Sequence, residues 1–187
     1  MKLFISWAKD SAEAMALELH SWIPRVTLNN VKTWCPADPK CLPQGENFPA
    51  KVLHAAIECD ACVAILTRES LSGWWVNFET GLFFGQKKPV YAVLCGDVTH
   101  SMLGAHGHPL SANGVNYTSI DKASLASFLT SLKINDPDWV KNDFSKQVTD
   151  NFAELGGKYD ALFGPSYTKI SKLLADSGGK SGEMTDI

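Results

Sequence analysis

The sequence predicts an α/β protein: a doubly wound, parallel, five-stranded sheet followed by a C-terminal helical extension. Two observations carry this prediction. Short apolar segments alternate along the chain with longer segments whose apolar residues recur every three or four positions, as on one face of a helix. Two of the short segments, Cys62–Leu66 and Pro89–Cys95, are apolar throughout. Such segments are typical of strands that are buried on both faces of a parallel sheet.

The expected strands are the short apolar runs between the helical segments. In chain order they are Lys2–Ser6, Val31–Trp34, Asp60–Thr67, Pro89–Cys95 and Val115–Ser119. The last of them is expected at an edge of the sheet.

The first helix is expected to begin at Asp10, since Glu13 follows at the spacing of a capping box, and to end at Pro24. Three further helices are expected at 46–59, 72–85 and 121–132. The segment Gly96–Gly114 is rich in Gly and His and is expected to be irregular. The core face of the fourth helix comprises Leu125, Phe128, Leu129 and Leu132.

One domain is expected at 1–133, a helical extension at 134–176 and a disordered tail at 177–187. Asp136-Pro137 is typical of a helix start, and apolar residues then follow at helical spacing until Gly156-Gly157, which is expected to stop the helix. Ser166–Ala175 is expected as a last short helix.

Composition excludes several classes of function. The 187 residues carry a net charge of -3 and contain no Lys/Arg-rich run, so neither nucleic acid nor an anionic membrane is an expected partner. No apolar run approaches the roughly 18 residues of a membrane span. The five cysteines are an odd number in a chain without an export signal, which predicts a reduced, cytoplasmic protein.

No metal site is expected from the sequence. Cys59-Asp60-Ala61-Cys62 has C-x-x-C spacing but lacks a second pair at zinc spacing. His106-Gly107-His108 lies in a Gly-rich loop without further ligands nearby. Both are interpreted as structural residues.

The candidate functional carboxylate is Glu79, in the segment Ser72–Gly85. At about 100° per residue, Glu79 falls within one arc of aromatic and apolar side chains. A carboxylate is costly to bury there unless it is paired or protonated. Two interpretations stay open: a glutamate at the rim of the helix, or a functional carboxylate at the floor of an aromatic cleft. The arc comprises Trp74, Trp75, Phe78, Leu82 and Phe83.

Ligands of an open parallel sheet bind at the carboxyl ends of its strands, which here are Ser6-Trp7, Trp34-Cys35, Thr67-Arg68 and Cys95-Gly96. No G-x-G-x-x-G follows the first strand and no P-loop is present. A site with one carboxylate and several aromatic side chains is suited to a reaction in which a cationic aromatic group leaves a sugar. The rings hold the aromatic group and the carboxylate stabilises an oxocarbenium-like centre.

Three stretches resemble Toll/interleukin-1 receptor (TIR) domains of the bacterial type, over roughly residues 1 to 132. They are Phe4-Ile5-Ser6-Trp7, the loop from Trp34 to Gly45, and the helix in which Trp75 is followed by Glu79 and Gly81. Two features depart from the family. The loop is richer in Pro and Cys than usual, and the segment after Asp136 has no counterpart in a minimal TIR domain.

The resemblance implies a flavodoxin-like fold and an enzyme that cleaves the nicotinamide–ribose bond of NAD⁺ as substrate, with no cofactor. Glu79 would be the catalytic residue. The expected substrate-binding residues are Phe4, Ser6, Trp7, Trp34 and Trp75. The family also implies self-association through TIR–TIR contacts, and we expect Leu42, Pro43 and Gly45 of the loop to gate the site or to form an assembly surface.

By resemblance to stand-alone TIR proteins of Thoeris antiphage systems, a cyclic ADP-ribose-type product read by a separate effector protein is expected. Two alternatives remain. One is a non-catalytic TIR–TIR interaction module acting through the Cys35–Gly45 loop. The other is a nucleoside deoxyribosyltransferase-like enzyme, which shares the fold and uses a carboxylate on an N-glycosidic bond.

Overall fold

Five strands form one sheet, in the order β2-β1-β3-β4-β5, and every neighbouring pair is parallel. This is the strand order of flavodoxin-like folds, so the predicted fold class is confirmed. Chain order reverses between β1 and β3, which makes the carboxyl end of β1 the topological switch point. The strands are β1 (Lys2–Ser6), β2 (Lys32–Trp34), β3 (Ala61–Leu66), β4 (Val90–Leu94) and β5 (Asn116–Ser119).

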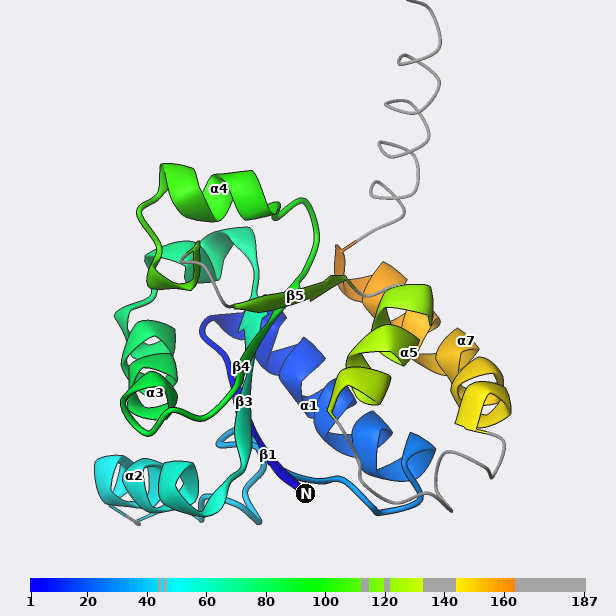
Figure 1. Ribbon diagram of the computed structural model, residues 1–187, viewed down its shortest axis with the longest axis horizontal. Helices are drawn as coiled ribbons and strands as arrows, with labels where there is room; N and C mark the ends of the chain where they lie inside the picture. Colours follow the sequence, from blue (N-terminus) through cyan, green and yellow to red (C-terminus); the bar gives the residue numbers. More distant parts are fainter. Residues whose placement is uncertain (44, 46, 112–114, 120–121, 133–143, 164–187) are drawn as a thin grey trace, which may run out of the picture.

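The computed structural model describes residues 1–43, 45, 47–111, 115–119, 122–132 and 144–163. Helices cover both faces of the sheet: α1, α5 and α7 lie on one side, and α2, α3 and α4 on the other (Figure 1). No described helix combines the length and the apolar character needed to cross a bilayer. The helices are α1 (Asp10–Val26), α2 (Phe48–Glu58), α3 (Trp74–Gly85), α4 (His100–Ala105), α5 (Lys122–Ser131) and α7 (Phe144–Phe163), with 3₁₀ turns η1 (Arg68–Ser72) and η2 (Pro109–Ser111).

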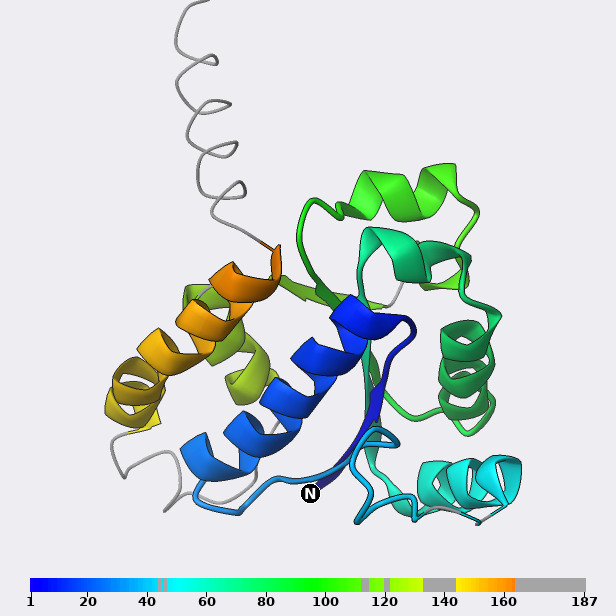
Figure 2. The same ribbon diagram turned by 180° about the vertical axis from the view of Figure 1, so that it is seen from behind.

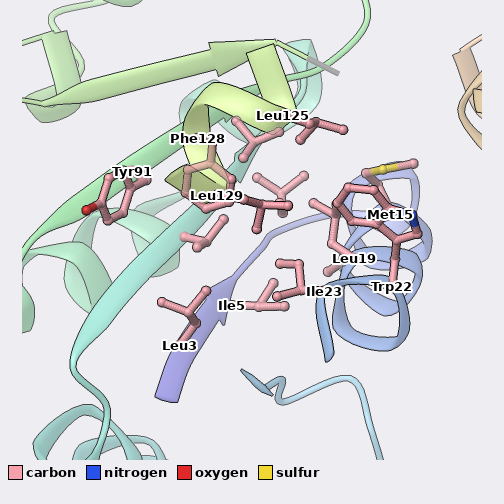
Figure 3. Close-up of a cluster of buried hydrophobic side chains, with 14 of the residues drawn as sticks. Leu3, Ile5, Met15, Leu19, Trp22, Ile23, Tyr91, Leu125, Phe128 and Leu129 are labelled. Carbon is pink, nitrogen blue, oxygen red and sulfur yellow. The ribbon is translucent and has the colours of Figure 1, made fainter. Parts of the chain in front are cut away.

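The two faces of β1 supply two separate cores, because successive side chains of a strand point to opposite sides. Leu3 and Ile5 pack against α1 and α5, where the predicted apolar faces of both helices are buried (Figure 3). Phe4 points to the opposite side and packs with the buried residues of α2 and α3. Ser6, two residues after Phe4, faces the same side as Phe4. The sheet therefore directs the end of β1 toward α3.

The first helix passes through Pro24 and ends at Val26, so the prediction that Pro24 ends it is wrong. A proline inside a helix lacks the N–H that would bond the carbonyl four residues earlier, and its ring clashes with that carbonyl. Together the two effects destabilise the helix by about 3 kcal/mol or more. Here the carbonyl of His20 instead accepts a hydrogen bond from the Thr33 hydroxyl, at 2.9 Å. The tertiary contact replaces the missing donor, and the helix continues for two more residues.

The prediction that Gly156-Gly157 stops the last described helix is also wrong, because α7 continues to Phe163. Each glycine in a helix interior costs about 1 kcal/mol relative to alanine. Leu155 and Tyr159 are buried against the core on either side of the pair, and each buried side chain of this size contributes about 1.5–3 kcal/mol. The Tyr159 hydroxyl also accepts a hydrogen bond from the Gly96 N–H at 2.7 Å. Packing therefore outweighs the glycine penalty.

Helix α7 lies beside α1 and shares its core (Figure 2). The Trp22 indole N–H donates to the Asn151 carbonyl at 3.2 Å, and Arg25 pairs with Glu154 at 3.0 Å. The described part of the extension is thus packed onto the α/β body. The predicted helix start at Asp136-Pro137, the helix at Ser166–Ala175 and the tail at 177–187 lie outside the described residues.

The segment Gly96–Gly114, expected to be irregular, contains α4 and η2. Leu103 and Leu110 are fully buried in the core on the α3 side of the sheet. This short helix has no long apolar repeat, so its formation depends on those two buried contacts rather than on a local signal.

Candidate active site

The site centres on a hydrogen bond between Ser6 and Glu79, residues 73 positions apart in the sequence. The Ser6 hydroxyl donates to Glu79 Oε2 at 2.5 Å, and both residues are fully buried. Ser6 is the last residue of β1, and Glu79 lies in the second turn of α3. The carboxylate therefore lies at the carboxyl end of the strand where the sheet order reverses, the position at which open α/β sheets bind ligands.

The turn between β3 and α3 determines how α3 approaches β1. Thr67 and Ser70 form a reciprocal capping box at the start of η1, which turns the chain at the end of β3. Gly73 then begins α3 in close contact with two other segments. A Cβ atom at Gly73 would lie 3.0 Å from the Ser70 carbonyl oxygen and 3.2 Å from the Ala8 Cβ. Glycine thus permits the first turn of α3 to pack on the loop that follows β1.

Helix α3 buries a different face from the predicted one. Its buried residues are Val76, Glu79, Thr80 and Phe83, at the i, i+3, i+4, i+7 spacing of one helix face. Trp74 is 70% exposed and Phe78 is 40% exposed, so the predicted aromatic arc is wrong in part. Helix α3 is apolar on nearly every side, and periodicity alone could not identify its buried face. Glu79 nevertheless lies on the buried face rather than at a rim.

Burial raises the pKa of Glu79 to about 8. The Ser6 hydrogen bond and the nearby Trp75 indole oppose this rise, because both favour the ionised carboxylate. Trp75 Nε1 nevertheless makes no hydrogen bond of good geometry. It and Glu79 Oε1 are both buried without a hydrogen-bond partner among the described residues. The indole N–H and the carboxylate oxygen can therefore each form a hydrogen bond, either with each other after a small shift or with a ligand.

The expected substrate-binding residues separate into two groups. Ser6 and Trp75 lie beside Glu79. Phe4 is fully buried, and its ring stacks on Trp34 at 4.9 Å and lies 5.5 Å from Phe83. Phe4 therefore packs against α3 from within the core and exposes no surface to a ligand.

Trp34 is half-buried and packs against the core on the α3 side of the sheet, whereas Trp7 packs against the core on the α1 side. Trp7 Nε1 is buried without a hydrogen-bond partner in the described part of the chain. The alternation of side chains along β1 accounts for this division, since Trp7 follows Ser6 by one position. The structure thus places Ser6 and Trp75 beside Glu79, Trp34 on the same side of the sheet, and Trp7 on the opposite side.

Lys9 is a feature of this region that sequence patterns did not indicate. It lies in the loop after β1 with φ 74° and ψ 157°, a conformation that is essentially restricted to glycine. Such a conformation costs of order 1–3 kcal/mol and is concentrated at functional sites. No residue type in the local sequence signals this strain.

The loop after β2 lies partly against the protein body. Leu42 is half-buried, whereas Pro43 and Gly45 are exposed. Gly45 has φ +87°, which glycine adopts without strain. Gln44 and Glu46 lie outside the described residues.

Comparisons with protein-family models, with curated proteins and with solved structures give no match for this chain. The chemistry of Glu79 and its neighbours is therefore the ground on which a function can be assigned.

Proposed function

We propose that the protein is a TIR-type NAD⁺ nucleosidase that cleaves the nicotinamide–ribose bond. The observation that carries the proposal is the Ser6–Glu79 pair: a carboxylate with a raised pKa, buried at the carboxyl end of β1 and bonded by the last residue of that strand. The resemblance of the segments around Ser6, the β2 loop and Glu79 to bacterial TIR domains supports the same assignment.

In this mechanism the ionised Glu79 carboxylate stabilises positive charge on the ribose. The N-glycosidic bond breaks, its electron pair passes to the nicotinamide nitrogen, and the neutral base leaves a ribosyl oxocarbenium ion. Water or a second nucleophile of the substrate then attacks that carbon and loses a proton. Since the nicotinamide of NAD⁺ is cationic, its binding beside Glu79 favours the ionised carboxylate.

Neighbouring groups are assigned supporting roles. The Ser6 hydroxyl orients the carboxylate and, when substrate is bound, shares it with the ribose hydroxyls. Trp75 and Trp34 offer aromatic faces for nicotinamide or adenine. Glu79 is fully buried, so substrate entry requires movement of a neighbouring side chain or loop. Trp75, which is half-buried beside Glu79, is the side chain we assign to this movement.

The deciding experiment incubates purified protein with NAD⁺ and, separately, with deoxynucleosides and a free base, and then separates the products by chromatography. Release of nicotinamide supports the proposal. Base exchange on deoxyribose instead identifies a deoxyribosyltransferase-like enzyme. If the protein alters neither substrate, even at concentrations at which it self-associates, it is an interaction module.

The interaction-module alternative is favoured by an aromatic cluster on the outer side of α2 and α3. Trp75 contacts Phe48, Trp74 and Phe78 at ring-centroid distances of 4.9, 4.8 and 5.2 Å, and these three partners are exposed. Exposed aromatic clusters of this kind are common at protein interfaces. Self-association through this surface is compatible with either function, because assembly and substrate entry both involve Trp75.

The cellular role follows as a proposal from the same resemblance: an antiphage enzyme, active in the cytoplasm, whose product is read by a separate effector protein. All five cysteines are free in the structure, and we propose a reducing compartment on the same grounds as in the sequence, an odd number of cysteines.

The main product from NAD⁺ is expected to be nicotinamide plus a cyclic ADP-ribose isomer, with linear ADP-ribose the minor one. A ribose hydroxyl or adenine nitrogen held close can have an effective molarity of ~10⁵ M or more, against about 55 M for water. Mass spectrometry distinguishes the two products because the cyclic one is lighter by one water. If linear ADP-ribose dominates under all conditions, including those that promote assembly, NAD⁺ depletion replaces signalling as the proposed role.

Replacing Leu42-Pro43 with Gly-Gly is expected to lower NAD⁺ cleavage severalfold and to leave the fold intact. Leu42 is half-buried against the body, and the prolines of this loop limit its conformations, so the change raises the entropy lost when the loop orders. The measurement is steady-state cleavage together with the thermal midpoint. Unchanged kinetics and unchanged oligomeric state would show that this stretch is only a connection.

A further inference from the structure

Three side chains with metal-binding atoms meet between α1 and the loop after β2. They are His20 of α1 and Asp38 and Cys41 of the loop, and one ligand atom from each lies within 4.8 Å of the others. In the described part of the chain this is the group that could hold a metal ion. The His20 and Asp38 side chains are 17% and 21% exposed, so the group is sheltered but reachable from solvent.

The contacts of the Thr33 hydroxyl favour one tautomer of His20, because the carbonyl of His20 needs a donor. The His20 carbonyl lacks its usual helical donor because residue 24 is proline, and the Thr33 hydroxyl donates to it at 2.9 Å. The same hydroxyl lies 2.7 Å from His20 Nδ1. A hydroxyl has one hydrogen, so when Thr33 donates to the carbonyl it accepts from Nδ1–H; in the other tautomer Thr33 donates to Nδ1 and Nε2–H donates to Asp38. In the first of these arrangements, the neutral imidazole carries a lone pair on Nε2.

That lone pair faces a carboxylate. His20 Nε2 lies 3.0 Å from Asp38 Oδ2, while Asp38 Oδ1 accepts from the Lys40 N–H at 2.8 Å. Two acceptors at this distance repel each other unless a positive charge lies between them. Either a second proton on His20 or a metal ion supplies that charge, and the nearby Cys41 thiol favours the metal ion, since Cys, His and Asp together form a donor set that suits zinc.

We propose that the protein binds one Zn²⁺ ion through His20 Nε2, Asp38 Oδ2 and Cys41 Sγ, with a fourth position open to water. Tetrahedral zinc with nitrogen and oxygen ligands at about 2.0–2.2 Å separates those two ligand atoms by roughly 3.3–3.6 Å, so Nε2 and Oδ2, now 3.0 Å apart, would move apart by a few tenths of an ångström. Cys41 Sγ lies within 4.8 Å of the other two ligand atoms, on a turn in which the Cys41 N–H donates to the Asp38 carbonyl at 2.8 Å, and this turn would move inward to place the sulfur on the ion. Thr33 acts as a positioning residue that holds His20 in the metal-binding tautomer.

Such an ion would fasten the loop after β2 to α1. His20 lies in the fourth turn of α1, and the chain connects it to the loop only by way of β2. An ion shared by His20, Asp38 and Cys41 would therefore limit how far the loop can move. The neutral imidazole, one carboxylate and one thiolate bring two negative charges to the ion, and the thiol releases its proton on binding. This inference does not depend on the proposed NAD⁺ chemistry.

The test uses the full chain, purified and stripped of metal with a chelator, and titrates it with zinc chloride in the presence of a competing zinc indicator. We expect one equivalent to bind. Cys41→Ser and His20→Gln should abolish competition with the indicator, and Thr33→Val should weaken affinity about 10- to 100-fold. Cobalt(II) in place of zinc should give a thiolate-to-metal charge-transfer band that Cys41→Ser removes.

His54→Gln is the matched control, because His54 is exposed, lies in α2 and pairs with Glu58 at 3.4 Å. It should bind zinc as the parent does, and circular dichroism should show that all variants remain folded. Less than half an equivalent bound by the parent overturns the proposal. So does binding that Cys41→Ser and Thr33→Val leave unchanged, since His20 and Asp38 would then be joined by a proton alone.

Discussion

Glu79→Gln is expected to abolish NAD⁺ cleavage, by about a thousandfold or more, while making the folded protein more stable. Glutamine keeps the size of the side chain and can accept the Ser6 hydrogen bond, but it cannot become negative. It therefore removes the charge that stabilises the oxocarbenium ion and preserves the packing of α3 against β1. Nicotinamide release measured under initial-rate conditions gives the loss of activity.

The stability gain follows from the raised pKa of Glu79. The group ionises near its usual value of 4.5 in the unfolded chain but at about 8 in the folded protein. Between those pH values the unfolded chain has lost a proton that the folded chain keeps, so stability falls as pH rises. At pH 7 the effect is roughly 3 kcal/mol. Glutamine does not titrate, although burial of its amide N–H offsets part of the gain.

Urea unfolding at pH 5 and pH 8 measures this effect. The stability of Glu79→Gln relative to the parent should increase by about 3–4 kcal/mol between the two pH values. Glu69→Gln is the matched control, because Glu69 is exposed in η1 and the same substitution there should leave the difference constant. Full NAD⁺ turnover by Glu79→Gln would overturn the mechanism, and a constant stability difference would show that Glu79 is ionised in the folded protein.

The second large effect concerns pH and activity. Because the reactive form carries an ionised Glu79 and its pKa is about 8, kcat/KM for NAD⁺ should fall as the pH drops below 8, with a slope that approaches tenfold for each pH unit. From pH 8 to pH 6 the expected loss is about 50-fold, because half of the Glu79 side chains are already protonated at pH 8. A pH series of kcat/KM in buffers of equal ionic strength gives the profile of the free enzyme.

Ser6→Ala tests whether that profile belongs to Glu79. The Ser6 hydrogen bond lowers the pKa of Glu79, so its removal should move the midpoint of the profile to higher pH. A variant that merely loosened the fold would lower activity at every pH without moving the midpoint. A profile of kcat/KM that is flat between pH 6 and pH 8 in the parent would contradict an ionised Glu79 as the reactive form.

The sequence by itself determined the fold class. Cys62–Leu66 is apolar at every position, and such a run is stable only where helices cover both faces of a strand. The core faces of α1 and α5 follow from helical spacing for the same reason, since burial of an apolar stripe is the main force that orients a helix. The choice of Glu79 as the candidate carboxylate also came from the sequence, because a charge within an apolar segment requires an explanation.

Only the tertiary structure decided how these elements meet. Helix α3 is apolar on nearly all sides, so its contacts with β1 and β3, and not its periodicity, determine that Glu79 is buried and Trp74 is exposed. The passage of α1 through Pro24 depends on the Thr33 hydroxyl, which comes from a different element. The approach of Asp38 and Cys41 to His20 likewise joins residues about 20 positions apart. Local sequence specifies which faces are apolar, but the pairing of polar groups across elements is a property of the packed chain.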